Sequence, residues 1–451
     1  MPKKTKIIFI IVFILIGIII LGLYLTSNKG KNTNTKTPVS LYQKFNPFNS
    51  NKTTTTTNPD SKGDNTTTIT NPNVVANTSN SKFHQITSFA VSGATFFNDT
   101  RPIQVKVVDT NSLTTPSLDT KNITANINDI KKIAANILPI KKDPTVEIVP
   151  SLRYVERSTG HIFQRYLDTG VEGKISNSTI PGVYEAIFND TANTVIYRYV
   201  TPGENSITSF LANLGGQSNF LNPNIIQMTL SKDKTKFFSL IKKQDGVVGI
   251  IKSFGDGKSN QVFNSSFSEW LPQWILDQNI YLTTKPSYLV EGSIFNLNIK
   301  NGTLSKIFGG VKGLTTLASN DGNYILFGAS TDAGPKLNIF DIKKHKSIDL
   351  DKFGLPEKCV WSNDNIYIYC AIPNIIEGNQ YPDAWYQGTI SFNDWFAKIN
   401  TITMTTETIA NSSTETPMDA TNLFLSSKED KLFFTNKKDS TLWSLDLSVS
   451  N

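Results

Sequence analysis

Histidine, cysteine and charged residues are all scarce in this sequence. Its 451 residues include 3 His and 2 Cys, and the charged types make up 18%, against about a quarter in ordinary globular domains. With so few histidines and cysteines, we expect no metal site, no cofactor and no histidine-based catalytic cluster. The low charge excludes a charged coiled coil and a highly charged disordered chain. A packed, β-rich protein agrees better with this composition.

The net charge of +7 is carried almost entirely by lysines that are dispersed singly along the chain. Arginine, whose planar side chain binds phosphate in a bidentate way, is rare. We therefore interpret the positive charge as a solvated surface and expect no nucleic-acid partner.

One long apolar run lies near the N-terminus, from Ile7 to Leu25, and it contains no charged residue. At about 1.5 Å per residue, a helix of this length crosses the hydrocarbon core of a bilayer. The run is longer than the apolar core of a cleaved signal peptide, so an uncleaved transmembrane anchor is predicted. Lys3, Lys4 and Lys6 precede it. The positive-inside rule then places residues 1–6 in the cytoplasm and the C-terminal domain outside the cytoplasmic membrane, in a single-pass topology.

Residues 26–82 consist mainly of Thr, Asn, Ser and Lys and contain few large apolar side chains. Such a segment cannot bury enough surface to offset the entropy of ordering it. We therefore expect a disordered linker between the anchor and a folded domain at residues 83–451.

Internal repeats within residues 83–451 predict the fold. In each copy an apolar strand leads into a turn, often of the form Ser-x-Asp, and a strand rich in aromatic and β-branched residues follows. The three clearest turns are Ser231 to Asp233, Ser319 to Asp321 and Ser362 to Asp364. Copies begin near residues 88, 183, 225, 271, 314, 358 and 420. Where no insertion intervenes, their spacing of about 42 to 46 residues is that of a four-stranded blade.

This count predicts an all-β protein, a seven-bladed β-propeller, with six or eight blades as the alternatives. The last blade ends with its third strand, so the segment from Phe83 to Thr87 is expected to supply the fourth strand and close the ring. The first blade carries an excursion at residues 98–150. Apolar residues between Ile127 and Leu138 recur at helical spacing, so the excursion either packs as a short helix or remains mobile.

Six stretches of the chain carry a family resemblance: Tyr154 to Phe163, Leu282 to Pro286, Leu355 to Ser362, Tyr369 to Pro373, Tyr381 to Gly388 and Phe433 to Lys438. They resemble an uncharacterised family of membrane-anchored, TolB-like or WD-repeat-like β-propellers from small-genome uncultured bacteria. The resemblance extends over roughly residues 83–447. It implies a membrane-anchored propeller, and it implies no substrate because no activity is established for that family.

Cys359 and Cys370 flank one predicted hairpin. Its register places Trp361 opposite Ile368 and the two cysteines directly across from each other. The space outside the cytoplasmic membrane permits disulfides. A cross-strand disulfide is therefore expected, with two reduced core cysteines as the alternative.

An insertion in the sixth blade, between Pro373 and Asp394, is the candidate ligand-binding site. It places the aromatic residues Tyr381, Trp385 and Tyr386 beside Asp383. Aromatic planes next to carboxylates suit a sugar or a peptide, and rigid rings are common anchors at protein interfaces. The alternative is that these rings pack the insertion onto its own blade.

Enzyme signatures are absent from the sequence, which has no Gly-x-Ser-x-Gly elbow, no Walker loop and no His-Glu-x-x-His motif. Together with the anchor, the linker and the blades, this favours a noncatalytic binding module of the cell envelope, whose partner is a protein or a cell-surface polymer. Two alternatives remain open. One is an envelope enzyme that acts on carbohydrate, with Asp383 and Asp394 as its acids. The other is a purely structural surface protein.

Overall fold

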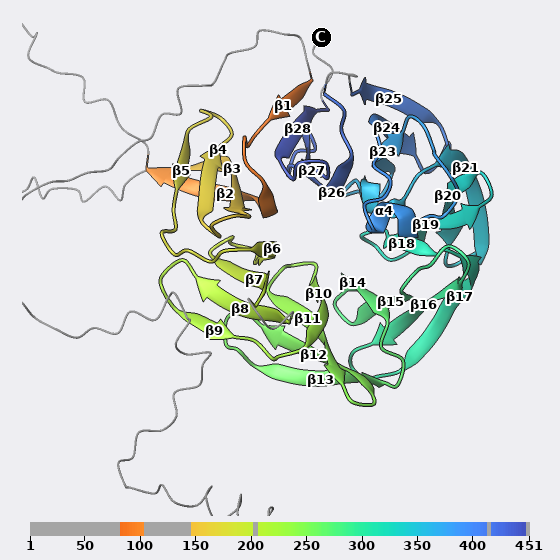
Figure 1. Ribbon diagram of the computed structural model, residues 1–451, viewed down its shortest axis with the longest axis horizontal. Coiled ribbons are helices and arrows are strands. Elements are labelled where there is room, and N and C mark those ends of the chain that lie inside the picture. Colours follow the sequence, from red (N-terminus) through yellow and green to blue (C-terminus); the bar gives the residue numbers. More distant parts are fainter. Residues whose placement is uncertain (1–81, 103–145, 202–205, 413–415, 448–451) are drawn as a thin grey trace, which may run out of the picture. The chain divides into compact units, whose positions relative to one another are not determined.

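The computed structural model describes residues 82–102, 146–201, 206–412 and 416–447. In these residues the strands form seven sheets of four strands each, and Figure 1 shows the sheets arranged around a ring. The prediction of a seven-bladed β-propeller is confirmed. The predicted anchor, the linker up to residue 81 and the predicted helix between Ile127 and Leu138 lie outside the described residues. Among the residues described, no helix is long and apolar enough to span a membrane.

The first three blades follow one another in chain order, and each uses four consecutive strands. The strands of the first blade are β2 (Val91–Pro102), β3 (Val146–Glu156), β4 (Ile162–Tyr166) and β5 (Glu172–Lys174). Those of the second are β6 (Val183–Phe188), β7 (Thr194–Val200), β8 (Ile207–Asn213) and β9 (Ser218–Phe220). Those of the third are β10 (Ile225–Leu230), β11 (Lys236–Lys243), β12 (Gly246–Ser253) and β13 (Ser259–Ser265).

The next three blades repeat this order. The fourth contains β14 (Trp270–Leu276), β15 (Asn279–Thr284), β16 (Glu291–Asn298) and β17 (Leu304–Lys312). The fifth contains β18 (Thr315–Ala318), β19 (Tyr324–Thr331), β20 (Gly334–Asp341) and β21 (Lys346–Phe353). A short 3-10 helix, η2 (Pro356–Lys358), leads into the sixth, which contains β22 (Cys359–Trp361), β23 (Tyr367–Pro373), β24 (Asp394–Asn400) and β25 (Thr406–Asn411).

The seventh blade combines strands from the two ends of the domain. Its order is β26 (Ala420–Leu425), β27 (Lys431–Asn436), β28 (Leu442–Asp446) and β1 (Phe83–Gln85), and β1 pairs with β28 so that Phe83 lies opposite Leu445. The predicted closure is confirmed. It leaves neither end of the ring as an unpaired edge inside the blade.

Apolar clusters fill the interfaces between neighbouring blades. Within the described residues there are seven such clusters, one for each interface of the ring. Between the seventh and first blades, for example, Leu152 and Tyr154 pack against Phe433 and Leu442, and all four are fully buried. Because each sheet is covered on both faces, its strands are apolar along much of their length rather than alternating.

The repeated Ser-x-Asp turn connects the first and second strands of a blade, and its hydrogen bonds explain the motif. The Ser319 hydroxyl donates to Asp321 at 2.6 Å and accepts the backbone N–H of Tyr324 at 3.0 Å. The same pair of bonds occurs at Ser231 and at Ser362. We call the side of the ring that carries these turns the turn face. Since successive strands of a blade are antiparallel, the loops that follow second strands lie at the opposite face.

Two further expectations concern the sixth and first blades. Cys359 and Cys370 pair across β22 and β23 and form a disulfide, as predicted. The excursion of the first blade differs in its limits, because β2 and β3 remain paired as far as Pro102 and Val146. The ends of the predicted segment at residues 98–150 therefore belong to a long hairpin. The sequence did not reveal this because residues 98–101 are all polar and carry no strand pattern.

Candidate functional site

The insertion of the sixth blade occupies residues 374–393, between β23 and β24, on the side opposite the turn face. It contains one helical turn, α4 (Asp383–Tyr386), which lies on the inner side of the ring in Figure 1. We call residues 374–393 the insertion and the face that carries it the insertion face.

Three of its aromatic residues form an apolar cluster of their own. Tyr381, Trp385 and Phe392 pack with Leu355, and all are buried. The rings of Tyr381 and Trp385 each stack on Phe392, at centroid distances of 5.7 and 6.3 Å. These rings therefore hold the insertion against the propeller, which is the packing alternative that the sequence left open.

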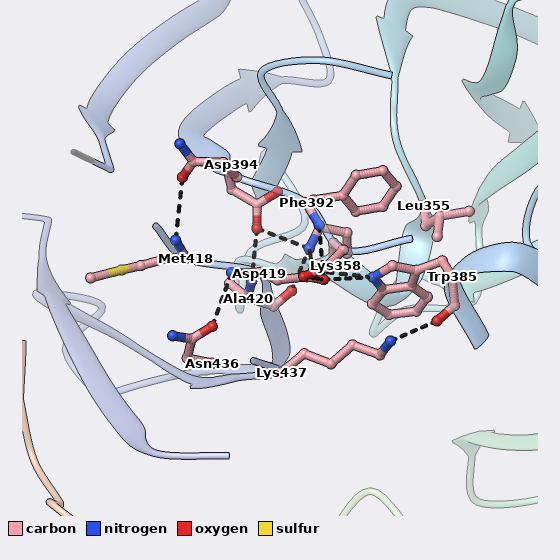
Figure 2. A network of polar contacts seen from close by, with 12 residues as sticks. Leu355, Lys358, Trp385, Phe392, Asp394, Met418, Asp419, Ala420, Asn436 and Lys437 are labelled. Atoms are coloured by element: carbon pink, nitrogen blue, oxygen red, sulfur yellow. Dashed lines mark hydrogen bonds and ion pairs between the residues drawn. The ribbon is translucent and has the colours of Figure 1, made fainter. Parts of the chain in front are cut away.

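An ion cluster lies next to the rings of Trp385 and Phe392 (Figure 2), and its three charged residues are fully buried. Lys358 Nζ lies 2.6 Å from Asp419 Oδ1 and 2.9 Å from Asp394 Oδ2, and it donates to the carbonyl oxygen of Ala420 at 2.8 Å. Lys358 ends η2, Asp394 begins β24, and Asp419 directly precedes β26. The cluster therefore joins the sixth and seventh blades at the point where the insertion ends.

The two carboxylates have different surroundings. Asp419 accepts hydrogen bonds from Trp385 Nε1 at 3.1 Å and from the backbone N–H of Phe392 at 3.0 Å. Burial opposes ionisation of Asp419, but Lys358 and these donors hold the pKa of its carboxyl below the usual range.

The Asp394 carboxylate has fewer hydrogen-bond partners than that of Asp419. Its Oδ2 accepts the N–H of Ala420 at 2.7 Å, whereas its Oδ1 is buried and has no hydrogen-bond partner in the described part of the chain. Burial raises the pKa of the Asp394 carboxyl to about 6, against the opposing effect of Lys358. The Lys358 ammonium thus forms ion pairs with two carboxylates, and Asp419 is the stronger acid of the two.

A second lysine approaches the cluster from the side of β27. Lys437 Nζ donates to the carbonyl oxygen of Trp385 at 2.6 Å and lies 4.7 Å from the centroid of the Trp385 ring. Burial lowers the pKa of Lys437. This lysine therefore ties α4 to the seventh blade through a cation–π contact and a hydrogen bond.

The four predicted binding residues occupy two different environments. Tyr381 and Trp385 meet inside the insertion and are closed to solvent, with Trp385 only 4% exposed. Asp383 accepts the backbone N–H of Tyr288 at 2.7 Å, which ties α4 to the fourth blade. Tyr386 is 41% exposed, and its hydroxyl donates to Glu357. Tyr386 is therefore the aromatic residue of the four that remains available to a partner.

The carboxylates considered as catalytic acids are engaged in packing. Asp394 is fully buried against Lys358, and Asp383 holds the Tyr288 loop. A carboxylate acid or base in glycoside hydrolysis must reach the bond that it cleaves. In the described residues, no group of three or more His, Cys, Asp or Glu side chains is placed to hold a metal ion.

Sequence reasoning missed Lys358 and Asp419. The one feature in the sequence that these two residues share is their position: each directly precedes the innermost strand of a blade, Lys358 before β22 and Asp419 before β26. In a sequence with dispersed lysines, however, a single Lys at such a point looks like any solvated lysine.

No protein-family model matches the sequence, and no curated protein is similar to it. Among solved structures, TolB from Acinetobacter baumannii is similar at 13% identity and a TM-score of 0.39, over 58% of this chain and 61% of TolB. An oligogalacturonate lyase in complex with manganese matches at 11% identity and a TM-score of 0.48, over 66% of this chain and 86% of the lyase. A prolyl endopeptidase matches at 11% identity and a TM-score of 0.44, over 66% of this chain and 50% of the peptidase.

This chain thus spans less than two thirds of the length of TolB. All three likenesses concern the fold alone. A fold by itself does not decide between binding and catalysis.

Proposed function

We propose that this protein is a membrane-tethered, extracytoplasmic β-propeller that acts as a noncatalytic protein-binding module of the cell envelope. The tether and the location rest on the sequence. They follow from the apolar span from Ile7 to Leu25, the lysines before it and the polar linker at residues 26–82.

The binding role rests on one observation, the way in which Tyr386 is presented. The helix that carries Tyr386 is fixed from below by the buried Trp385 and from the side by Asp383, which accepts the Tyr288 N–H. Tyr386 as a whole residue is 41% exposed. A rigidly held aromatic ring loses little entropy when a partner covers it, and tyrosine is enriched among interface residues that contribute most to affinity.

The noncatalytic role is supported by the state of the carboxylates in and beside the insertion. Asp394 and Asp419 share the buried Lys358, so neither carboxylate faces solvent. The Asp383 carboxylate is occupied by a backbone N–H. The engagement of Asp383, Asp394 and Asp419 in fixing the insertion supports a noncatalytic role.

A cross-linked pull-down tests the proposal. Full-length protein in detergent is incubated with native envelope extract and compared with Tyr386→Ala. The matched control is Ile402→Ala, because Ile402 is 72% exposed and lies in the turn between β24 and β25, on the turn face. We expect a protein captured by the wild type and by Ile402→Ala but lost with Tyr386→Ala.

Equal capture by all three proteins would contradict the placement of the contact at Tyr386. Capture of a polysaccharide instead of a protein would make the partner a polymer. Turnover of envelope glycan by the wild type would favour the carbohydrate-active enzyme.

A further inference from the structure

A second feature lies among the innermost strands of the ring, in blades other than the one that carries α4. A cavity of about 620 Å³ is bordered mainly by the innermost strands of four consecutive blades, β26, β2, β6 and β10. Its polar lining includes Ser92, Tyr184, Glu185, Gln227, Asn422 and Thr435. We call this cavity the channel chamber. Its volume lies within the range of about 300–1,000 Å³ that is usual for small-molecule sites.

The chamber is formed by β-bulges, one in each of these four strands. Each innermost strand has one more residue than its partner strand near its first residues: between Val91 and Gly93, Val183 and Glu185, Ile225 and Gln227, and Thr421 and Phe424. Residues within these bulges, Ser92, Tyr184, Ile226 and Asn422, all line the chamber. A bulge bends a strand and redirects its side chain.

The other innermost strands show that these bulges are not a general property of the ring. β18 and β22 pair with their neighbours without a register shift, and the shift in β14 lies near its last residue, between Trp274 and Leu276. The four aligned bulges are thus confined to the blades that surround the chamber.

Arg198 braces the chamber wall. It is only 4% exposed. Its Nη1 donates to Glu185 Oε2 at 2.5 Å, and its Nη2 donates to the carbonyl oxygens of Ile225 and Ile226 at 3.2 and 3.3 Å, so it holds the bulge of the next blade. Its Nε has no partner in the described residues. Since Arg198 and Glu185 form an ion pair and are the only charged residues in the lining, the chamber carries no net charge.

Four polar side chains in the lining have no hydrogen-bond partner among the described residues. Tyr184, Gln227, Asn422 and Thr435 make no side-chain hydrogen bond to another residue in the described part of the chain. Asn422 also adopts a left-handed backbone conformation, with φ of 52°, which a non-glycine residue adopts at a cost. Together they offer amide, hydroxyl and phenol groups, which both donate and accept hydrogen bonds.

Two aromatic rings complete the lining. Tyr184 has the guanidinium of Arg198 at 5.4 Å from its centroid, and Phe424 stacks on Phe433 at 5.2 Å. Both rings are half-buried, so each is held in place from one side and still contributes apolar surface to the chamber.

From this combination we infer that the channel chamber is a binding site for an uncharged saccharide. Neutral donors and acceptors match sugar hydroxyl groups, and the ring surfaces match the apolar faces of a pyranose. A charged ligand finds no unpaired charge in the chamber. This site is independent of the protein contact proposed at Tyr386.

The test uses full-length protein in a detergent without a sugar headgroup, screened on an array of neutral and acidic glycans. The strongest soluble neutral glycan is then titrated by calorimetry against Gln227→Ala and Asn422→Gly. Glycine keeps the left-handed backbone at residue 422 while removing the amide. Gln261→Ala is the control, because Gln261 is exposed on the outer strand β13.

We expect selective binding of neutral glycans, and about ten-fold weaker binding for each chamber variant because each removes a hydrogen bond. Gln261→Ala should bind like the wild type, and all variants should keep the thermal unfolding midpoint of the wild type. Binding to no neutral glycan, preference for acidic glycans, or wild-type affinity in the folded Gln227→Ala and Asn422→Gly variants would each overturn the proposal. Because Tyr386 is unchanged in these variants, capture of the protein partner reports separately on the proposed function.

Discussion

Lys358 and Asp419 join two neighbouring blades through a buried ion pair of 2.6 Å, and each stands directly before the innermost strand of its blade. A charged pair at this depth pays a large desolvation penalty, so it gives little net stability compared with apolar packing. What it does provide is a fixed geometry, because the hydrogen bonds of Asp419 reach Trp385 and Phe392 of the insertion. The cluster thus specifies where α4 sits.

Removing the Lys358 cation should therefore destabilise the protein by much more than the small net contribution of the ion pair to stability. Lys358→Met leaves Asp394 and Asp419 buried without their common partner, and we expect a loss of about 3–5 kcal/mol in the free energy of unfolding. Urea unfolding of the variant measures it. Lys300→Met, at an exposed turn, is the control and should change stability by less than about 0.5 kcal/mol. Similar losses in both variants would mean that the ion cluster does not hold the insertion.

The raised pKa of Asp394 predicts a pH dependence of stability. Its pKa is about 6 in the folded protein and near 3.8 in the unfolded chain, so between these values the folded state binds more protons. The contribution of Asp394 to stability is then fully present below pH 4 and is lost as the pH rises through 6. Unfolding free energies from pH 3.5 to 7 should show the wild type losing stability relative to Asp394→Asn across this window. A constant difference between the two proteins would show that the carboxyl does not titrate there.

Sequence reasoning located the blades because the turn motif and the strand pattern are local properties. The Ser319 turn, for example, is held by hydrogen bonds within six residues of chain, so its signal is present in the sequence itself. The ion cluster and the channel chamber depend on residues from different blades, such as Gln227 and Asn422, which only the closed ring brings to one cavity. The sequence also cannot predict that Tyr386 is exposed and Trp385 is buried, because both residues lie on the same helical turn.

The disulfide between Cys359 and Cys370 should contribute measurably to stability, although it closes a short loop of sequence separation 11. Replacing both cysteines with alanine should lower the free energy of unfolding by about 2–3 kcal/mol, because the unfolded chain regains the freedom that the cross-link removes. Denaturant unfolding of the double variant measures this loss. Since both cysteines are buried, the native wild type should also resist a mild reductant. Rapid reduction without unfolding would show that the sheet opens locally at this point.

The strand β1 closes the ring, and Phe83 anchors it. The Phe83 ring packs edge-on against Phe396 and Phe434, at centroid distances of 5.3 and 6.5 Å. Phe83→Ala should therefore destabilise the protein by about 2 kcal/mol, which is less than for a fully buried ring. His84→Ala on the same strand removes an exposed contact with Asp446 and should change stability little. Hydrogen exchange of β28 amides should increase in the first variant only; equal exchange in both would contradict closure by packing.

Gly93 provides the sharpest test of the bulged chamber wall. A Cβ at Gly93 would lie 2.0 Å from the carbonyl oxygen of Ala186, so β2 can approach β6 this closely only because the residue is glycine. Gly93→Ala should lower the free energy of unfolding by about 3 kcal/mol, since backbone atoms cannot move aside as a flexible side chain can. It should also abolish glycan binding, because the walls of the first and second blades separate. Gly173→Ala is the matched control: a Cβ there meets nothing within 4 Å, so stability and binding should be retained. Unchanged glycan affinity in a folded Gly93→Ala protein would place the saccharide outside the chamber.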